Sequence, residues 1–344
     1  MADWRRYSQR WYAGYAFQGA VVLGVAPILL PLVVGKAGGS ALAGAIVAIF
    51  YCGQLAAPLL GAFADRTSRF RLVYFAGYVL LGLGLALFPA MPDAWGWAGM
   101  ALLMGMGSAA TNTVASMYIV EFKPREEWDP RIGWLQTFYG TGQALGLALA
   151  ALLQASPMVG LVISGALMVP GALLGTLQIP RAKHRARPEH VSFDHHRLRR
   201  PRLAFSQLKH YEKVRLEHLG HALVSIRGAG GPFARWILGW FLVMLAAWFE
   251  FNLLPLLMQA CYGVGAAASS GVYAFGAGLG IFAYAPSGAL GRKVGDFSVV
   301  FTGVLMTLVG AAGMAVVAWL HPPGQGWWAA GFFTLLPVAW SPLI

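Results

Sequence analysis

The chain has 344 residues, of which 58% are apolar and only 11% are charged, and its mean hydropathy is +0.61. A soluble domain carries about 25% charged residues, so this composition excludes a soluble enzyme, a disordered chain and a disulfide-held secreted module. Two cysteines, Cys52 and Cys261, are too few for a disulfide framework. The composition predicts a membrane protein with several spans.

Ten stretches stay apolar over the roughly 20 residues that a helix needs to cross the hydrocarbon core. Runs of this length predict helices, because barrel strands alternate over about ten residues. The first run is expected to be retained, since it is over about 20 residues long and lacks a convincing cleavage site. The predicted spans are 12–34, 41–63, 72–90, 97–119, 132–153, 158–179, 235–258, 266–290, 298–320 and 327–344.

The positions of the basic residues predict the orientation of these spans. With the amino terminus in the cytoplasm, all of the 25 Lys and Arg residues except Lys36 lie in inside segments or at their edges. This distribution obeys the positive-inside rule, so topology explains the net charge of +12 and no nucleic acid partner is expected. The expected location is the plasma membrane, which in a bacterium is the inner membrane.

The predicted domains are a six-helix bundle at 1–180, a basic cytoplasmic linker at 181–231 and an incomplete four-helix bundle at 232–344. Within the linker, 203–226 has the spacing of an amphipathic helix on the inner leaflet, or of a short cytosolic helix. The linker histidines have no cysteines beside them, so neither a metal site nor a cofactor is expected. No phosphate-binding glycine loop is found, which argues against an ATP-driven pump.

The two bundles share a sequence pattern. The first and seventh spans carry Pro31 and Pro255, and glycine-rich basic loops that begin at Gly61 and Gly288 follow the second and eighth spans. Two halves of like orientation with matching features indicate parallel repeats.

The loop Gly61-Ala-Phe-Ala-Asp-Arg-Thr-Ser-Arg-Phe-Arg71 resembles the signature loop of the major facilitator superfamily, and the second loop keeps its glycines but exchanges Arg and Asp. The resemblance implies two helical bundles around a central cavity. It also implies that the loops act as a conformational latch, although the arginines could serve only to fix the topology. The latch candidates are Gly61, Asp65, Arg66, Arg69, Arg71, Gly288, Arg292, Lys293 and Asp296.

Two departures from the family pattern are visible. Family members usually have twelve spans, so we expect this ten-span chain to be truncated at its carboxyl end. In the fifth predicted span, the antiporter-type G-P-x-x-G pattern keeps Gly142 and Gly146 but lacks the proline. The remaining Gly-x-x-x-Gly spacing predicts close packing against another helix.

Glu250 is the one acid that lies well inside a predicted span. A charged group at that depth is costly, so it is protonated, paired or facing water. It is a candidate proton carrier or a binding group for a cationic substrate; the alternative is a structural carboxyl between helices. Other polar candidates for substrate or proton binding, each of which could instead form interhelical hydrogen bonds, are Gln18, Asn112, Tyr139, Gln143 and Asn252.

Together these features predict a secondary active transporter that moves a small organic solute across the lipid bilayer by alternating access. Coupling to protons through Glu250 is a hypothesis. No enzymatic site is expected. The alternative is a non-transporting membrane scaffold or sensor with the same fold, or an inactive fragment.

Overall fold

The computed structural model describes residues 7–179, 238–239, 241–243, 251, 254 and 256–343. It leaves out the side chains at 126, 129, 266, 285, 286, 288, 289, 291–293 and 296. The chain divides into one compact unit, Met1–Arg185 with Ala247–Ile344, and a second unit, Ala186–Ala246. The predicted linker and its segment 203–226 lie outside the described residues, and only the first unit is considered below.

The first two predicted spans form a nearly continuous helical stretch. It consists of α2 (Tyr12–Gly19), the π-helix η1 (Ala20–Val25), α3 (Ala26–Gln54) and α4 (Ala57–Thr67). Gly39 interrupts α3 with φ +77°, a conformation that costs glycine little because it has no Cβ. The break falls between the predicted spans 12–34 and 41–63.

The next four predicted spans are also helices. They are α5 (Phe70–Leu87), which continues into the 3-10 helix η2 (Phe88–Ala90), α6 (Ala94–Phe122), α7 (Trp128–Leu153) and α8 (Pro157–Gln178). A short 3-10 helix, η3 (Arg125–Glu127), precedes α7. Asp93 caps α6 by accepting a hydrogen bond from the backbone N–H of Gly96 at 2.8 Å.

The described carboxy-terminal residues form α11 (Ala266–Val294), α12 (Asp296–Leu320) and α13 (Gln325–Leu343). They correspond to the last three predicted spans, and residues 256–262 are helical before them. We call α2 to α8 the N-half helices and α11 to α13 the C-half helices. The described residues contain helices and no strand, as the all-α prediction requires.

By length and composition, four helical stretches in the described residues can cross a membrane, or five if the bent pair Leu256–Tyr262 and Ala267–Tyr284 counts as one. The first stretch, Tyr12–Thr67, has 56 residues, enough for two crossings at 1.5 Å per residue. Helices α6, α7 and α11 have 26 to 29 residues. They carry more polar residues than the four, as expected of helices that face other helices.

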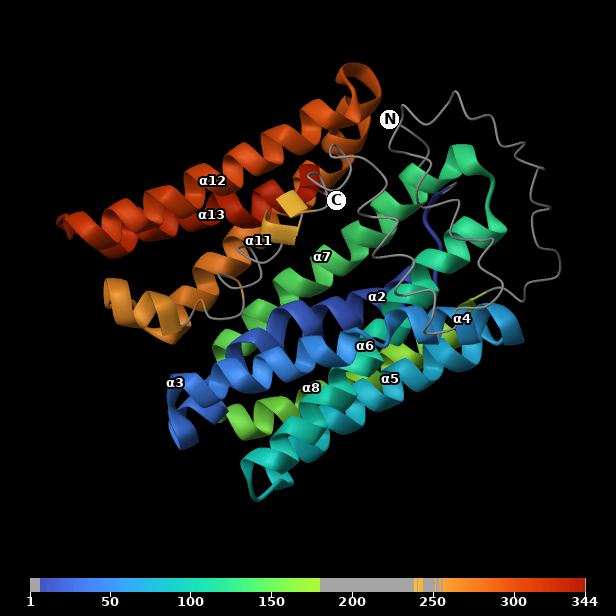
Figure 1. The fold of residues 1–344 in the computed structure, drawn as a ribbon, viewed down its shortest axis with the longest axis horizontal. Coiled ribbons are helices and arrows are strands. Elements are labelled where there is room, and N and C mark those ends of the chain that lie inside the picture. The colour runs from blue at the N-terminus through green and yellow to red at the C-terminus, as the bar shows by residue number, and fades with distance from the viewer. Residues whose placement is uncertain are drawn as a thin grey trace. The chain divides into compact units, whose positions relative to one another are not determined.

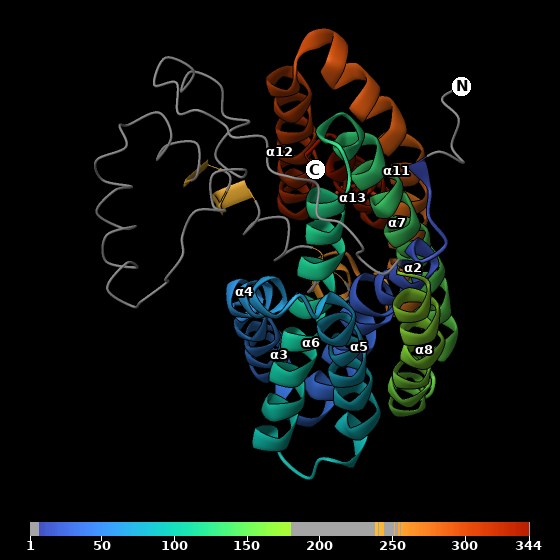
Figure 2. The same ribbon diagram turned by 90° about the vertical axis from the view of Figure 1, so that its right-hand side faces the viewer.

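Within the N-half, α5 packs against α6 and α8, α3 against α6, and α2 against α7 and α8. Within the C-half, α13 lies beside α11 and α12 (Figure 1). The two halves meet where α7 packs along α11, which the turned view shows from the side (Figure 2). Exposed apolar residues such as Leu152, Leu177 and Phe282 face outward for contact with lipid.

Helix α7 approaches α2 and η1 as closely as the Gly-x-x-x-Gly spacing predicts. A methyl group at Gly142 would overlap the carbonyl oxygen of Ala16, and one at Gly146 would overlap that of Ala20. A methyl group at Gly24 would lie 2.6 Å from the Cα of Gly146. The backbones of the two helices are therefore in direct contact, which fixes α7 against the first span.

Candidate functional site

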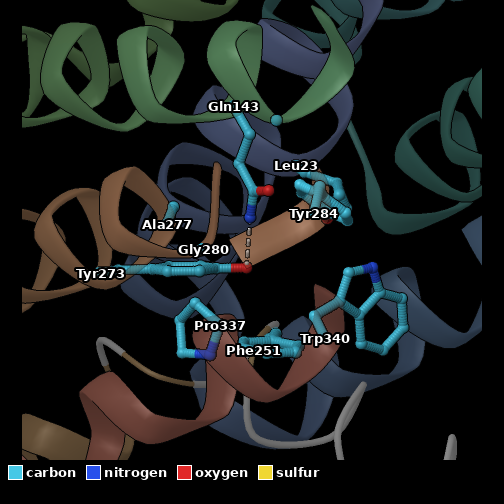
Figure 3. Close-up of a pocket in the computed structure, with 10 residues that line it drawn as sticks. Leu23, Gln143, Phe251, Tyr273, Ala277, Gly280, Tyr284, Pro337 and Trp340 are labelled. Atoms are coloured by element: carbon cyan, nitrogen blue, oxygen red, sulfur yellow. Dashed lines mark hydrogen bonds between the residues drawn. The ribbon is translucent and has the colours of Figure 1, made fainter. Parts of the chain in front are cut away.

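The two halves share a pocket where α7 and η1 face α11 and α13 (Figure 3). It encloses about 370 Å³ of space between atoms, part of which is open to solvent. The lining residues are Leu23, Gly140, Gln143, Phe251, Tyr273, Ala277, Gly280, Tyr284, Pro337 and Trp340.

Aromatic rings form one wall of the pocket. Phe251 and Tyr273 are stacked, with ring centroids 5.3 Å apart and an interplanar angle of 8°. Trp340 meets Phe251 edge-on at 5.9 Å and 85°, and Phe333 supports both stacked rings from behind with edge contacts. Such aromatic pairs are stabilised beyond their buried area, so this wall is a preformed surface.

A glutamine supplies the polar side. Gln143 of α7 donates a hydrogen bond from Nε2 to the hydroxyl of Tyr273 in α11 at 3.1 Å (Figure 3). A second amide on the same helix, Gln154, donates to Oγ of Ser270 at 3.0 Å. Both bonds cross from the N-half to the C-half. Each can be broken without disrupting the packing inside either half.

Close packing of α13 on α11 forms another wall of the pocket. A methyl group at Gly280 would lie 2.7 Å from the carbonyl oxygen of Pro337, and Ser341 donates from Oγ to the carbonyl of Gly280 at 2.7 Å. Only a residue without a side chain allows this approach. It places Pro337 and Trp340 at the pocket.

Three of the predicted binding residues form a separate polar cluster inside the N-half. Gln18 is fully buried and donates from Nε2 to Oδ1 of Asn112 at 2.7 Å, and Tyr15 donates its hydroxyl to the same oxygen at 3.0 Å. The Tyr15 ring lies 4.6 Å from that of Tyr139. Gln18, Asn112 and Tyr139 do not line the pocket, so their interhelical contacts favour the packing alternative for them.

Of the six predicted binding residues, Gln143 lines the pocket, and Glu250 and Asn252 lie outside the described residues. The sequence analysis missed the aromatic lining residues Phe251, Tyr273 and Trp340. Aromatic side chains within apolar spans resemble ordinary packing residues, and only the rotation of each helix reveals which of them face the pocket.

The first latch loop is the end of α4, where Ser68 ends the helix with φ +53°. Arg66 and Arg69 are exposed, Asp65 is half-buried, and Arg71 donates from Nη2 to the carbonyl of Ile179 beyond α8. A methyl group at Gly61 would touch Thr113 of α6 at 3.0 Å. This geometry ties the loop to neighbouring N-half elements, and the latch role stays a prediction.

In the second latch loop, Gly288, Arg292 and Lys293 lie near the end of α11, and Asp296 begins α12. Their side chains lie outside the described part of the structure. No contact with the first loop is therefore described, and the proposed partnership between the two loops remains a prediction.

A partly buried ion pair lies near the start of α7, where the sequence analysis used Arg131 only as evidence for the topology. Arg131 is 7% exposed and pairs with Glu127 at 2.7 Å. Its guanidinium also donates to the carbonyl of Tyr7 at 3.5 Å. Desolvation, and then the positive charge of Arg131, lower the pKa of nearby Lys123, which follows the last residue of α6.

Comparisons with known proteins extend these findings. The sequence model of the Major Facilitator Superfamily matches residues 11–343. A search of curated protein sequences gave no match. The structure is similar to a crystal structure of a D-xylose-proton symporter, with 15% identity, a TM-score of 0.61, and coverage of 96% of this chain and 78% of that one. It is also similar to the inward-open xylose transporter XylE from E. coli, with 15% identity, a TM-score of 0.58, and coverage of 97% and 79%. At this identity the two structures support the fold alone.

Proposed function

Because the chain belongs to the major facilitator superfamily, a family of membrane transporters rather than enzymes, we propose that it is a secondary transporter of a small organic solute. The solute would bind in the pocket between α7 and α11 and reach each side of the membrane in turn. The observation that carries the proposal is the composition of the pocket, which both halves build and which a hydrogen bond between Gln143 and Tyr273 spans.

Alternating access requires an interface that opens without unfolding either half. The bonds from Gln143 and Gln154 join neutral groups, and such a bond contributes only about 0.5–1.5 kcal/mol net. Inside the N-half, by contrast, α2 and α7 are in backbone contact at Gly142 and Gly146. The difference supports rigid-body motion of the halves with a hinge at the α7–α11 contact.

Proton coupling through Glu250 is part of the proposal. It is supported by the position of Glu250 in the sequence, one residue before Phe251 of the pocket wall. One similar structure is named a proton symporter. If Glu250 carries the proton, Glu250→Gln would remove the dependence of uptake on a pH gradient while leaving exchange of solute without a gradient. Retention of full pH-dependent uptake in this variant would rule out the role.

The proposed orientation places the amino terminus in the cytoplasm, because nearly all basic residues then lie inside. We propose that the protein lies in a plasma membrane, which in a bacterium is the inner membrane. The glycine-rich loops at Gly61 and Gly288 would act as a latch between the halves in one of the two states.

A cysteine at Ala277 tests alternating access without knowledge of the solute. Ala277 lines the pocket and is 6% exposed. In a background with Cys52→Ser and Cys261→Ser, Ala277→Cys would be treated with a membrane-impermeant thiol reagent from each side of sealed vesicles. Labelling from both sides is expected. Labelling from one side only would indicate a fixed conformation, as in a scaffold or sensor, and would contradict the proposal.

A further inference from the structure

We propose that the pocket binds an uncharged, ring-shaped solute that lies flat against the aromatic wall and presents a hydroxyl or carboxamide edge to Gln143 and Tyr273. This inference rests on the proposed function and names the chemical class of its solute. It uses three properties of the pocket, which are the lack of charge among its described lining residues, its aromatic side chains and its hydrogen-bonding groups.

The first property is charge. Among the described lining residues of the pocket, none is Asp, Glu, Lys, Arg or His. An ion that enters such a site loses its hydration without gaining an opposite charge, and this desolvation is a large penalty. Organic anions are therefore the least favoured class. Organic cations are the competing class, because aromatic faces attract them and because Glu250 precedes Phe251 in the sequence.

The second property is shape. Phe251 and Trp340 meet at 85°, so they form a corner in which a flat molecule can lie on one ring and touch the edge of the other. Tyr284 and Trp340 lie on the side toward which the Tyr273 hydroxyl points (Figure 3). Flat apolar faces of this kind occur on pyranoses and on planar heterocycles.

The third property is hydrogen bonding. Gln143 donates one of its two amide N–H groups to the Tyr273 hydroxyl. Its amide oxygen and its second N–H can still bond to a ligand, and so can the hydroxyl proton of Tyr273. Among the residues that the structure describes, no further hydrogen-bond partner is found for either side chain. The pair therefore offers an acceptor and donors side by side. A hydroxyl or a carboxamide, each both donor and acceptor, is the matching ligand group.

Two sets of probes with the same ring and different charge test the class. The first set is D-glucose, D-glucuronate and D-glucosamine, and the second is nicotinamide, nicotinate and the 1-methylnicotinamide cation. Binding to the purified full chain would be measured by thermal shift and by tryptophan fluorescence at constant pH and salt. In at least one set, we expect the neutral member to bind about 10-fold or more tightly than both charged members, a difference of about 1.4 kcal/mol.

Variants of the full chain then assign the binding to the pocket. Gln143→Ala should weaken binding of the neutral probe about 10-fold. Gln154→Ala is the matched control, because it removes the other amide bond between α7 and α11 but does not line the pocket, and its effect should stay below about 2-fold. Trp340→Ala should weaken binding similarly, whereas Trp327→Ala, at an 86% exposed site of the same helix, should not.

Four results would overturn the proposal. Two of them concern the probes alone: a charged member binds more tightly than the neutral one in both sets, or none of the six probes binds. The other two concern the variants: Gln143→Ala and Gln154→Ala weaken binding equally, or a cationic probe binds tightly and Glu250→Gln abolishes that binding. A cooperative melt of each variant shows that it is folded. Two-sided labelling of Ala277→Cys, which needs no solute, separates failure of this class from failure of the proposed transport function.

Discussion

Replacement of Gly142 by alanine should disrupt the contact that positions α7. A methyl group there would overlap the backbone oxygen of Ala16, and a backbone atom cannot rotate away as a side chain can. At the same interface, a methyl group at Gly24 would lie 2.6 Å from the Cα of Gly146, about 0.9 Å inside a normal carbon contact. The helices must therefore separate by about that amount or more.

Overpacking of this kind costs about 1–3 kcal/mol, and sometimes more. Alanine in place of an interior helical glycine would otherwise stabilise the helix by about 1 kcal/mol. Because the overlapped atom belongs to the backbone, we expect an overpacking cost of about 3 kcal/mol or more. After the helix gain of about 1 kcal/mol, Gly142→Ala should lower the free energy of unfolding by about 2 kcal/mol or more. Because Gln143 is the next residue, ligand binding should weaken as well.

The matched control is Gly133→Ala, since Gly133 lies in the same helix and a methyl group there meets no atom within 4 Å. Thermal melts in one detergent, followed by circular dichroism, would compare the two variants. Gly142→Ala should melt several degrees below the wild type, and Gly133→Ala should melt at or above it. Equal melting temperatures for the two variants would refute the argument that α2 and α7 are in backbone contact.

Three further predictions concern the N-half. Arg131→Ala should destabilise the protein by about 2 kcal/mol, because it removes the charge-assisted bond between Arg131 and the partly buried Glu127, whereas exposed Arg125→Ala should change stability by less than about 0.5 kcal/mol. Similar losses for the two variants in chemical denaturation would count against this prediction. Asn112→Ala should cost about 1–3 kcal/mol, because two buried side chains lose their shared acceptor, and an unchanged melt would contradict it. Because the pKa of Lys123 is lowered by burial, the unfolded state binds more protons just below pH 10.5. Stability should therefore rise with pH in that window, and Lys123→Gln should remove this part of the rise in melts across alkaline pH.

The sequence predicted the helices well, because long apolar runs dominate the pattern of a membrane protein. The predicted boundary between the first two spans is matched by Gly39, whose φ of +77° breaks α3. The spacing of Gly142 and Gly146 predicted a close contact, and the structure supplies the partner, the backbone of Ala16 and Ala20. A sequence pattern can show that a helix packs closely but not against which helix.

The sequence predicted the lining of the pocket less well, for a physical reason. Polar residues in apolar spans are chosen as site candidates because burying them without a partner is unfavourable. Gln18 and Asn112, however, are stabilised by a hydrogen bond to each other. Gln143 is likewise a polar residue in an apolar span, but it lines the pocket. What separates these residues is the rotation and depth of their helices, which depends on packing. Aromatic residues such as Trp340 carry no distinctive signal at all.

Solute exchange tests the central claim most directly, namely that the pocket between the halves is a transport site. Proteoliposomes that contain the full chain would be preloaded with the tightest-binding neutral probe, D-glucose or nicotinamide, and diluted into a labelled trace of the same probe. The account predicts transient uptake of label, reduced about 10-fold by Gln143→Ala and unchanged by Trp327→Ala. A probe that binds in a Gln143-dependent way but is not exchanged would contradict the account and indicate a receptor.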